Sequence, residues 1–345
     1  MAPAGGKQAR VYRFNEYGGP EKLQLKEEEV PYPSAGHVRV RVEAMSLNNA
    51  DSLFLANQYL EPPALPSKIG YEIAGTVDAI GEGVKQFSVG DRVSAIPAFS
   101  VAEYANFAEL TVLPERALMH TPRNLDKIQA ASFTFAYFTN YYGLFDLGQL
   151  KPFQTVLITA ASSTTGLAAI SMVRAAGSTV IATSRSSAKA DALKKAGANY
   201  VIATAEEDLV ERVHAITGGK GVDIAYDCIA GPMSEAIVNC VRQFGHWVVY
   251  GAMDSSPVPF PVLQLMVKTV KLDTFMVFDF TGHPGLNIPA NDQALARAME
   301  YVSRGIESGA LPIVVDKVFE GLEGLPDALR RQQKGTGTGK IVVEL

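Results

Sequence analysis

The segment TVLITAASSTTG, residues 155–166, decides the fold class of this protein. Its first half is apolar and predicts a buried strand over 155–160, which a turn rich in serine and threonine joins to a helix from about Thr165. Further strands are predicted at 179–183, 200–202, 222–228 and 246–250, with helices from about Ser187, over 206–217 and from about Met233. Strands that alternate with helices indicate an α/β fold with a parallel, doubly wound sheet.

The turn in this segment is a candidate phosphate-binding site. Dinucleotide-binding folds place the pattern G-x-G-x-x-G between the first strand and its helix. Here Ala161 and Ser163 stand at the first two glycine positions, and only Gly166 remains. Small side chains would let the backbone N–H groups and hydroxyls of Ser163, Thr164 and Thr165 reach a pyrophosphate at the positive end of the helix. The alternative is an ordinary serine or threonine helix cap that binds no ligand.

The end of the second predicted strand indicates which nicotinamide nucleotide the site would take. Folds that bind NAD place an acidic residue there, about 20 residues after the glycine motif, to bind the ribose 2′-hydroxyl. In this chain Ser184 and Arg185 occupy that region, Lys189 follows, and residues 183–189 contain no carboxylate. Because a cation is a suitable partner for a 2′-phosphate, Arg185 and Lys189 favour NADPH over NADH. Alternatively, Arg185 belongs to an exposed turn and Lys189 to a solvated helix face.

The parts of the chain on either side of this block have a different character. Over His37–Glu43, valines alternate strictly with Arg39, Arg41 and Glu43, which predicts a half-buried antiparallel strand with the charged residues outward. Short apolar runs separated by glycines follow, as is typical of a compact β-rich domain. A helix near 292–307 and a strand at 340–345 are predicted at the other end. We therefore expect a sheet domain, 127–280, inserted into a β-rich domain made of 1–126 and 281–345.

Length and composition exclude several classes of protein. A chain of 345 residues exceeds the size at which a single core stops growing, so two domains are expected. Hydrophobic residues make up 47% and charged residues 19%, which indicates a globular protein rather than a disordered or coiled-coil one. A net charge of −5 provides no general attraction for nucleic acid, so none is expected as a partner.

Cysteine and histidine usage argues against metal sites and disulfides. Cys228 and Cys240 are too few for a disulfide framework or a four-cysteine zinc site, and the five histidines lack ligand spacing. The N-terminal residues do not contain the apolar core of a signal peptide, so a cytoplasmic location is the expectation. The uncharged stretch 152–173 is broken by polar residues, so we expect a strand and a turn there rather than a membrane span.

The order of motifs along nearly the whole chain resembles the medium-chain dehydrogenase/reductase superfamily. Within it the chain is similar to the zinc-free quinone oxidoreductases, the zeta-crystallin-like branch. The resemblance implies a Rossmann domain inserted in a GroES-like domain, an NADPH-dependent reductase and a homodimer. The motifs that carry it are NNAD (48–51), GYEIAGTVDAIGEGV (70–84), VGDRV (89–93), TAASSTTG (159–166), KKAGANYVI (194–202), ITGGKGVDIAYDC (216–228) and GKIVVEL (339–345).

The resemblance also implies roles for single residues. Asn48 and Asp51 match the N-x-x-D loop of the branch, whose Asn lies beside the nicotinamide and the substrate. Tyr59 matches a tyrosine near the substrate, and lining the pocket is the better interpretation because an ordinary tyrosine is a poor acid at neutral pH. Thr139 matches a threonine at the nicotinamide end, and Gly251 matches a turn over the cofactor. For Asn48 the alternative is a residue that only shapes a turn.

The implied activity is hydride transfer from NADPH to a quinone in the cleft between the domains. Zinc-dependent members carry a Cys near position 48 and a His in a GHE motif, whereas this chain has Asn48 and Tyr71, so no catalytic zinc is expected. An alkenal or enone double-bond reductase is the nearest alternative, because hydride delivery to an enone also creates an enolate-like oxyanion. A cofactor-binding protein with little turnover, structural or RNA-binding, is the alternative from another class.

Two segments depart from the branch. The tyrosine that can contact the 2′-phosphate is replaced by Thr204, which is predicted to begin a capping box, Thr204–Glu207, for the next helix. The segment FMVFDF, 275–280, is unusually aromatic, and we expect it to wall an apolar pocket or to form a dimer contact.

Overall fold

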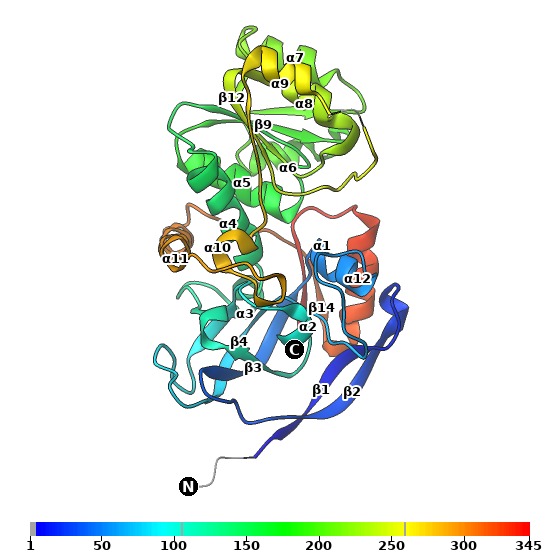
Figure 1. Ribbon diagram of the computed structural model, residues 1–345, viewed down its shortest axis with the longest axis vertical. Helices are drawn as coiled ribbons and strands as arrows, with labels where there is room; N and C mark the ends of the chain where they lie inside the picture. Colours follow the sequence, from blue (N-terminus) through cyan, green and yellow to red (C-terminus); the bar gives the residue numbers. More distant parts are fainter. Residues whose placement is uncertain (1–4, 105, 259) are drawn as a thin grey trace. The chain divides into compact units, whose positions relative to one another are not determined.

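The computed structural model describes residues 5–104, 106–258 and 260–345 (Figure 1). The chain forms two compact units, each made of segments that are distant in sequence. The first unit comprises the residues up to Phe135 together with Phe278–Met299 and Val315–Leu345. The second comprises Ala136–Val277 and Glu300–Val314.

These limits differ from the expected domain boundaries at 126/127 and 280/281. Residues 127–135 belong to the first unit because the Ser94 hydroxyl donates to the Ala130 carbonyl at 2.8 Å and the Thr134 hydroxyl donates to the Ala95 carbonyl at 2.7 Å. Residues 300–314 belong to the second because the Tyr137 hydroxyl donates to the Pro312 carbonyl at 2.8 Å. We propose domain limits that follow these contacts.

The second unit is built on a six-stranded parallel sheet, which confirms the α/β expectation. Its strands lie in the order β10-β9-β8-β11-β12-β13, and every pair is parallel. Numbered within the sheet, this is the 3-2-1-4-5-6 order of a doubly wound Rossmann fold. The strands are β8 (Thr155–Ile158), β9 (Thr179–Ser184), β10 (Tyr200–Ala203), β11 (Val222–Asp227), β12 (Val241–Val249) and β13 (Lys271–Thr274).

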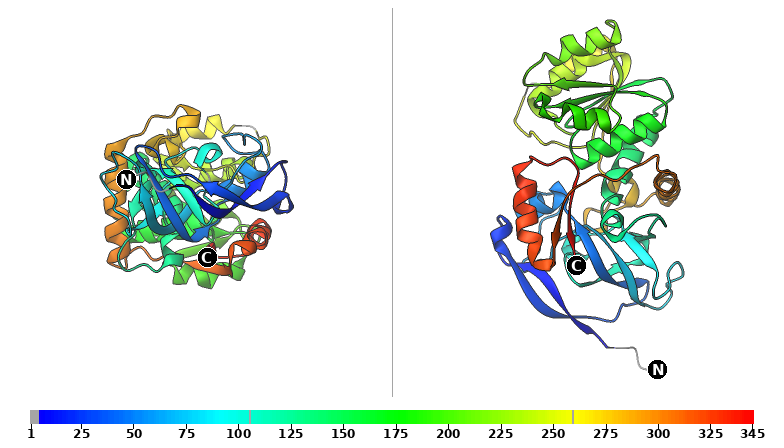
Figure 2. Two further views of the ribbon diagram at one scale, coloured as in Figure 1. Left: turned by 90° about the horizontal axis from the view of Figure 1, so that it is seen from below. Right: turned by 180° about the vertical axis from the view of Figure 1, so that it is seen from behind.

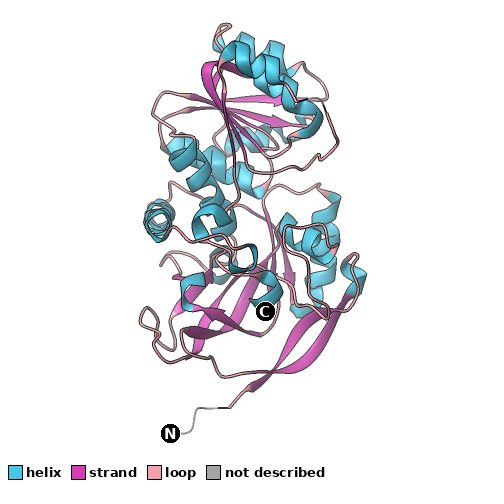
Figure 3. Ribbon diagram, viewed as in Figure 1, coloured by secondary structure: helices cyan, strands magenta, loops and turns pink. Residues whose placement is uncertain are grey.

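Helices cover both faces of this sheet (Figure 3). In Figure 1, α7 to α9 lie on one face and α5 and α6 on the other. Buried Leu157, Ile181 and Trp247 of the strands pack with Leu209 and Val213 of α7 in one apolar cluster, so the helix stripe and the sheet face form a common core. The helices of this unit are α5 (Thr164–Ala175), α6 (Ala190–Lys195), α7 (Leu209–Thr217), α8 (Ser234–Cys240) and α9 (Val262–Lys268), with a π-helical turn at Tyr142–Leu147. The helix α4 (Thr134–Tyr141) begins in the first unit and belongs to this one from Ala136.

The prediction of a helix over 206–217 with a capping box at Thr204 is wrong at its start. The helix begins at Leu209, and the N-cap is Asp208, whose carboxylate accepts the Glu211 backbone N–H at 2.8 Å. A carboxylate at this position stabilises the helix start as well as serine or threonine does. The Thr204 hydroxyl instead donates to the Ser184 carbonyl at 3.3 Å, which ties the residue to the end of β9.

The first unit contains a seven-stranded sheet and a separate two-stranded one. The larger sheet has the order β14-β15-β3-β4-β5-β7, with β6 paired to β3. In Figure 2 the C-terminal strands lie beside the N-terminal ones, as the antiparallel pairing of β15 with β3 requires. The strands are β1 (Lys7–Phe14), β2 (Leu23–Val30), β3 (His37–Ser46), β4 (Glu72–Ile80), β5 (Arg92–Ala95), β6 (Leu110–Pro114), β7 (Leu118–His120), β14 (Val315–Glu320) and β15 (Lys340–Glu344).

Short helices surround this sheet. The helices are α1 (Asn49–Leu55), α2 (Val101–Tyr104), α3 (Lys127–Ala130), α10 (Phe278–Thr281) and α12 (Leu325–Lys334). A longer helix, α11 (Asp292–Glu307), begins in this unit and continues into the second unit from Glu300. α11 has the bounds predicted from the sequence. Among the described residues, no helix is long and apolar enough to cross a membrane, and the uncharged stretch 152–173 forms β8, the turn and most of α5.

One charged residue of β3 is not where the alternation placed it. Val38, Val40 and Val42 are buried as predicted, but Arg39 is also buried, with only 1% of it exposed. Its guanidinium forms an ion pair with Asp78 at 2.7 Å and donates to the Val30 carbonyl at 3.4 Å. Both faces of the strand are therefore covered at this point. A strict alternation of apolar and charged residues predicts only one buried face.

Candidate functional site

The turn after β8 is closed by a serine cap and packs closely against the helix that follows it. Ser163 is the N-cap of α5, and its hydroxyl accepts the Gly166 backbone N–H at 3.0 Å, while Thr164 and Thr165 begin the helix. A Cβ atom at Gly166 would lie 2.6 Å from the Cα of Ala161, so only glycine allows the helix to approach the turn this closely. Ala160 has φ of 43°, a left-handed conformation that non-glycine residues rarely adopt. The turn is thus both a serine cap and a strained loop at a helix N-terminus.

Lys189, one of the two cations predicted to bind the 2′-phosphate, lies against this turn. Lys189 Nζ donates to the Ser162 hydroxyl at 3.3 Å, so a side chain that follows β9 reaches the loop that follows β8. Ser184 is buried, and its hydroxyl donates to the Ser186 carbonyl at 2.6 Å, which shapes the turn. Arg185 is exposed. Two of the predicted cofactor-binding segments therefore meet in the structure.

The turn that follows β9 also contacts a carboxylate, that of Glu206. Glu206 accepts the Ser187 backbone N–H at 2.9 Å, and this hydrogen bond lowers the pKa of the Glu206 carboxyl. The residue follows β10, seventeen positions beyond Lys189, the last residue of the segment 183–189 that contains no carboxylate. Only the pairing of β9 with β10 brings it to the same edge of the sheet.

The two remaining predicted cofactor residues lie in other parts of the same unit, one within a helix and one after a strand. Thr139 is buried in α4, and its carbonyl accepts the Tyr226 hydroxyl at 3.4 Å. Gly251 follows β12, and a Cβ atom there would lie 3.2 Å from the Cys228 carbonyl oxygen. A larger residue would have to move the loop after β11, which explains why glycine occupies the position.

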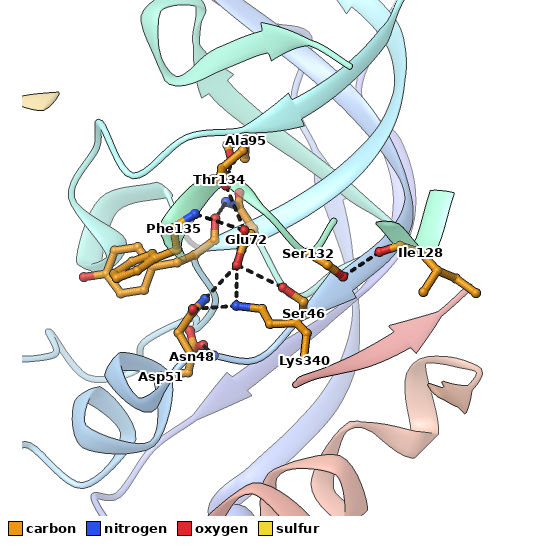
Figure 4. Close-up of polar contacts among 12 residues, drawn as sticks. Ser46, Asn48, Asp51, Glu72, Ala95, Ile128, Ser132, Thr134, Phe135 and Lys340 are labelled. Atoms are coloured by element: carbon orange, nitrogen blue, oxygen red, sulfur yellow. Dashed lines mark hydrogen bonds and ion pairs between the residues drawn. The ribbon is translucent and has the colours of Figure 1, made fainter. Parts of the chain in front are cut away.

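A buried polar cluster surrounds Asn48 in the first unit, and Figure 4 shows its side chains converging. Lys340 Nζ lies 2.6 Å from Asn48 Oδ1 and 2.6 Å from Glu72 Oε2. The Asn48 amide nitrogen donates to the same Glu72 oxygen at 3.2 Å. Asn48 precedes α1, but its amide makes these long-range contacts, so the residue does more than shape a turn.

Glu72 is the centre of the cluster, and sequence reasoning missed it. Its Oε2 also accepts from the Ser46 hydroxyl at 3.0 Å, and its Oε1 accepts from the Phe135 backbone N–H at 3.0 Å. The single hydrogen of the Thr134 hydroxyl is shared between Glu72 Oε1, at 2.9 Å, and the Ala95 carbonyl, at 2.7 Å. Burial alone would raise the pKa of the Glu72 carboxyl, but the charge of Lys340 and these hydrogen bonds hold it below its usual range. The available signal was the charge in two otherwise apolar strand motifs, GYEIAG and GKIVVEL.

Asp51 lies at the edge of the same cluster. Its Oδ2 accepts the Asn48 backbone N–H at 2.7 Å, and its Oδ1 is buried with no hydrogen-bond partner among the described residues. Burial raises the pKa of the Asp51 carboxyl to about 7, against the opposing effects of the Asn48 N–H and the Lys340 charge. The carboxyl therefore changes its charge near neutral pH.

Tyr59 packs on a second tyrosine at an aromatic wall. Its ring meets that of Tyr71 edge to face with centroids 6.1 Å apart, and Tyr71 in turn contacts Phe99, Phe135 and Phe278. Burial raises the pKa of the Tyr59 phenol above its usual range, followed in size by the effects of Asp51 and Glu61. A phenol shifted in this direction is a poorer acid, which agrees with a lining role.

The phenylalanine rings of the aromatic segment 275–280 are buried rather than exposed on the surface. Phe275, Phe278 and Phe280 are at most 6% exposed. Phe278 packs on Tyr71 and on His283 in the first unit, whereas Phe275 packs on Tyr142 and Tyr250 in the second. The surfaces of these three rings are therefore covered within the chain.

The described residues contain no group of three or more His, Cys, Asp or Glu side chains that could hold a metal ion. At the positions where zinc-dependent relatives carry ligands, the Asn48 amide is bonded to Lys340 and the Tyr71 ring is packed among other rings. An ammonium ion thus supplies the positive charge beside Asn48 and Glu72.

Comparison with known proteins matches both parts of the chain to one superfamily. Residues 34–123 match the family described as "Alcohol dehydrogenase GroES-like domain", and residues 164–286 match the family described as "Zinc-binding dehydrogenase". The quinone oxidoreductase of Pseudomonas aeruginosa is 35% identical over 243 residues, which cover 70% of this chain and 73% of that protein.

Solved structures agree over the full length. The structure of Escherichia coli quinone oxidoreductase complexed with NADPH superimposes with a TM-score of 0.86 at 27% identity, covering 97% of this chain and all of that one. An NAD-dependent alcohol dehydrogenase superimposes with a TM-score of 0.87 at 26% identity, covering 97% and 99%, so the fold by itself does not select the cofactor. The chain belongs to the quinone oxidoreductase family of the medium-chain dehydrogenase/reductase superfamily, with a GroES-like domain and a Rossmann domain, and is an oxidoreductase of that type.

Proposed function

We propose that this protein is an NADPH-dependent quinone reductase. The observation that carries the proposal is the contact of Lys189 with Ser162, which places a cation at the turn expected to hold the phosphates. A 2′-phosphate needs a cationic partner, whereas a free ribose 2′-hydroxyl is usually bound by a carboxylate. The likeness to an NADPH-complexed quinone oxidoreductase supports the same cofactor.

The residues of this chain fit the cofactor and have separate tasks. NADPH supplies the hydride when it is bound. In our proposal Ser163, Thr164, Thr165 and Gly166 present backbone N–H groups to the pyrophosphate. Arg185, with Lys189, neutralises the 2′-phosphate.

Further residues are assigned to the nicotinamide and the acceptor. Thr139 and Gly251 border the nicotinamide end, and Asn48 donates to the quinone oxygen that gains negative charge as it is reduced. Tyr59 lines the acceptor site, and Asp51 holds the backbone N–H of Asn48. Solvent supplies the proton that completes the reduction.

The test measures the loss of reduced-nicotinamide absorbance with NADPH and NADH in parallel. The acceptors are an ortho-quinone, a para-quinone and an α,β-unsaturated ketone of similar size. Quinone-dependent oxidation of NADPH well above that of NADH is expected. Activity confined to the enone would make the protein a double-bond reductase. The same residues could serve that reaction, because hydride transfer to either acceptor creates an enolate-like oxyanion. Tight NADPH binding with no oxidation by any acceptor would favour a cofactor-binding protein with little turnover.

Asn48→Ala tests the assignment of the oxyanion donor. Loss of such a donor lowers turnover by about 10²-fold where the donor acts only in the transition state. Asn49→Ala is the matched control, because Asn49 is the neighbouring amide residue and is exposed. Equal turnover of the two variants would return Asn48 to a purely structural role.

We further propose that catalysis is independent of zinc. The Lys340 ammonium between Asn48 and Glu72 supports this, because it would repel a divalent cation from the same place. Treatment with a chelator is expected to leave NADPH oxidation unchanged, and metal analysis of the active protein is expected to find less than one zinc per chain. Restoration of lost activity by added zinc would overturn this part of the proposal.

We also propose that the protein forms a homodimer through its second unit. Seven exposed apolar side chains lie on α9 and on the segment before it, and α9 precedes the edge strand β13 in the chain: Met253, Val258, Phe260, Val262, Leu263, Met266 and Val267. An exposed apolar patch of this kind is typical of an interface between subunits. A second copy of the chain is the expected occupant, in agreement with the homodimer that the family resemblance implies.

The dimer is tested by the molar mass in solution. Leu263→Glu combined with Met266→Glu is expected to give a monomer, because two carboxylates would have to be buried in the contact. Val89→Glu is the control, since Val89 is equally exposed but lies in the first unit. A monomeric mass for the unmodified protein at micromolar concentration would contradict the proposal.

A further inference from the structure

Lys340 is a buried lysine whose ammonium contacts the amide of Asn48. Only 1% of the residue is exposed, and its Nζ lies 2.6 Å from Glu72 Oε2. A buried charge is costly unless it is paired, so the contact with Glu72 accounts for its burial. The contact with Asn48 Oδ1, also at 2.6 Å, is a second one that charge pairing alone does not require.

The chemistry of the three groups fixes the orientation of the amide. An ammonium ion can only donate hydrogen bonds and an ionised carboxylate can only accept them, whereas an amide has one end of each kind. Lys340 donates to the oxygen of Asn48, and Glu72 accepts from its nitrogen at 3.2 Å. A flipped amide would place N–H against the ammonium and C=O against the carboxylate, so both contacts would become repulsive.

The remaining partners of Glu72 keep this arrangement rigid. Ser46, Thr134 and the Phe135 backbone all donate to the carboxylate, so neither of its oxygens is left without a partner (Figure 4). The carboxylate is therefore held on the strands and on the start of α4, and it cannot follow a rotation of Asn48. One N–H of the Asn48 amide makes the contact with Glu72, and the second N–H has no acceptor among the described residues, so it is available to a ligand.

We infer that Lys340 is a positioning residue for the reaction, which acts by holding the Asn48 amide so that it offers its second N–H, and not its carbonyl, to the oxygen of the electron acceptor. This inference rests on the proposed role of Asn48 as the oxyanion donor. It adds a residue from the last strand of the chain, β15, which makes its contribution through Asn48 and does not itself touch the substrate.

A double-mutant cycle on turnover tests the inference. Lys340→Met in the unmodified background is expected to lower kcat with a quinone by about tenfold or more, because a misplaced donor loses most of its effect. In the Asn48→Ala background the same substitution is expected to change kcat less than about twofold, because the group that it positions is absent. An equal drop in both backgrounds would overturn the inference, since Lys340 would then act independently of Asn48.

The readouts separate positioning from general damage. The KM and the Kd for NADPH are expected to stay unchanged in Lys340→Met, and Lys340→Arg, which keeps a charged donor, is expected to recover most of the lost kcat. Lys334→Met is the matched control, because Lys334 is an exposed lysine of the same unit. A fall in NADPH affinity that matches the fall in kcat would contradict a positioning role.

Two outcomes distinguish this inference from the proposed function. If Asn48→Ala leaves kcat unchanged, the oxyanion role proposed for Asn48 fails and the inference fails with it. If Asn48→Ala lowers kcat but the cycle is additive, only the inference fails. Because Lys340→Met leaves Glu72 as an unpaired buried charge, the cycle is repeated with Glu72→Gln plus Lys340→Met in place of the single substitution. This pair leaves no unpaired charge and is expected to show the same lack of additivity.

Discussion

Lys189 Nζ and Ser162 Oγ lie 3.3 Å apart, although one follows the second strand of the Rossmann sheet and the other follows the first. The contact joins the turn expected to bind the pyrophosphate to the segment expected to bind the 2′-phosphate. Parallel neighbouring strands end at the same edge of a sheet, so their following loops can share a ligand. The phosphates of a single nucleotide would therefore face both loops.

Removal of the two cations at this edge is expected to weaken NADPH binding selectively. Arg185→Ala with Lys189→Ala should weaken the NADPH complex by about 2–6 kcal/mol, at about 1–3 kcal/mol for each of the two charged hydrogen bonds. NADH affinity should hardly change, because NADH has no 2′-phosphate. Titration of the protein fluorescence with each nucleotide measures both affinities. Lys195→Ala, an exposed lysine on α6, is the control, and an equal loss for both nucleotides would contradict the assignment.

The negative charge of Glu206 is expected to weaken the binding of the same 2′-phosphate by repulsion. Its carboxylate accepts the Ser187 N–H at 2.9 Å, a donor that an incoming phosphate could use. Glu206→Gln keeps an acceptor but removes the negative charge, so NADPH should bind about two- to fivefold more tightly at low salt, as expected for one exposed charge. The gain should shrink at high ionic strength, where such interactions are screened. Glu211→Gln, an exposed residue on α7, should have no effect.

Asp51 is expected to make the stability of the protein fall as the pH rises toward neutrality. The pKa of its carboxyl is about 7 in the folded chain, against about 3.9 when unfolded. Between these values the folded state binds more protons than the unfolded state, so the free energy of unfolding decreases with rising pH over the window from about 4 to 7. The total change is on the order of 2–4 kcal/mol.

Asp51→Asn should remove this slope, because the amide cannot ionise. Chemical unfolding of both proteins at several pH values measures the effect. Glu72 contributes in the opposite direction: its folded pKa is lowered, so its stabilisation is lost only as the pH falls below the usual range of a glutamate. A parallel pH dependence of the two proteins between pH 4 and 7 would show that Asp51 is ionised throughout.

Gly166 is expected to tolerate no side chain. The Cβ of Gly166→Ala would lie 2.6 Å from the Cα of Ala161 and 2.7 Å from its carbonyl oxygen, so the helix or the turn must shift. We expect a loss of about 1–3 kcal/mol in stability, typical of overpacking, together with weaker NADPH binding. Gly251→Ala is the milder substitution for comparison. Its Cβ would lie 3.2 Å from the Cys228 carbonyl oxygen, so a shift of a few tenths of an ångström would accommodate it and the loss of stability should be smaller. Equal stability of the two variants would contradict this account.

The sequence alone was sufficient to predict the Rossmann sheet. Its strands are apolar and short, and each is followed by a helix, so local periodicity and connection order leave few other topologies. The helix cap at Ser163 and the requirement for Gly166 were also predictable, because both depend on neighbours within a few residues. The start of α7 was mispredicted because two plausible caps, Thr204 and Asp208, lie close together and only packing selects one.

The arrangement around Asn48 was decided by tertiary structure. The sequence singled out Asn48 and Asp51 from a motif of four residues, but it gave no reason to place them beside Glu72 or Lys340. These charges come from β4 and β15, and the pairing of β15 with β3 and of β3 with β4 brings them together. The burial of Arg39 has a similar origin, since Asp78 lies on the neighbouring strand.

The difference between the features that the sequence predicted and those that only the tertiary structure decided has a physical reason. Helices, turns and strand periods depend on interactions between residues close in the chain, so the sequence by itself determined the fold class, the serine-capped turn before α5 and the cationic segment after β9. Buried ion pairs depend on which distant strands become neighbours, and the cost of burying an unpaired charge then forces Lys340 and Glu72 to meet. Only the tertiary structure decided that this pair would also hold the amide of Asn48.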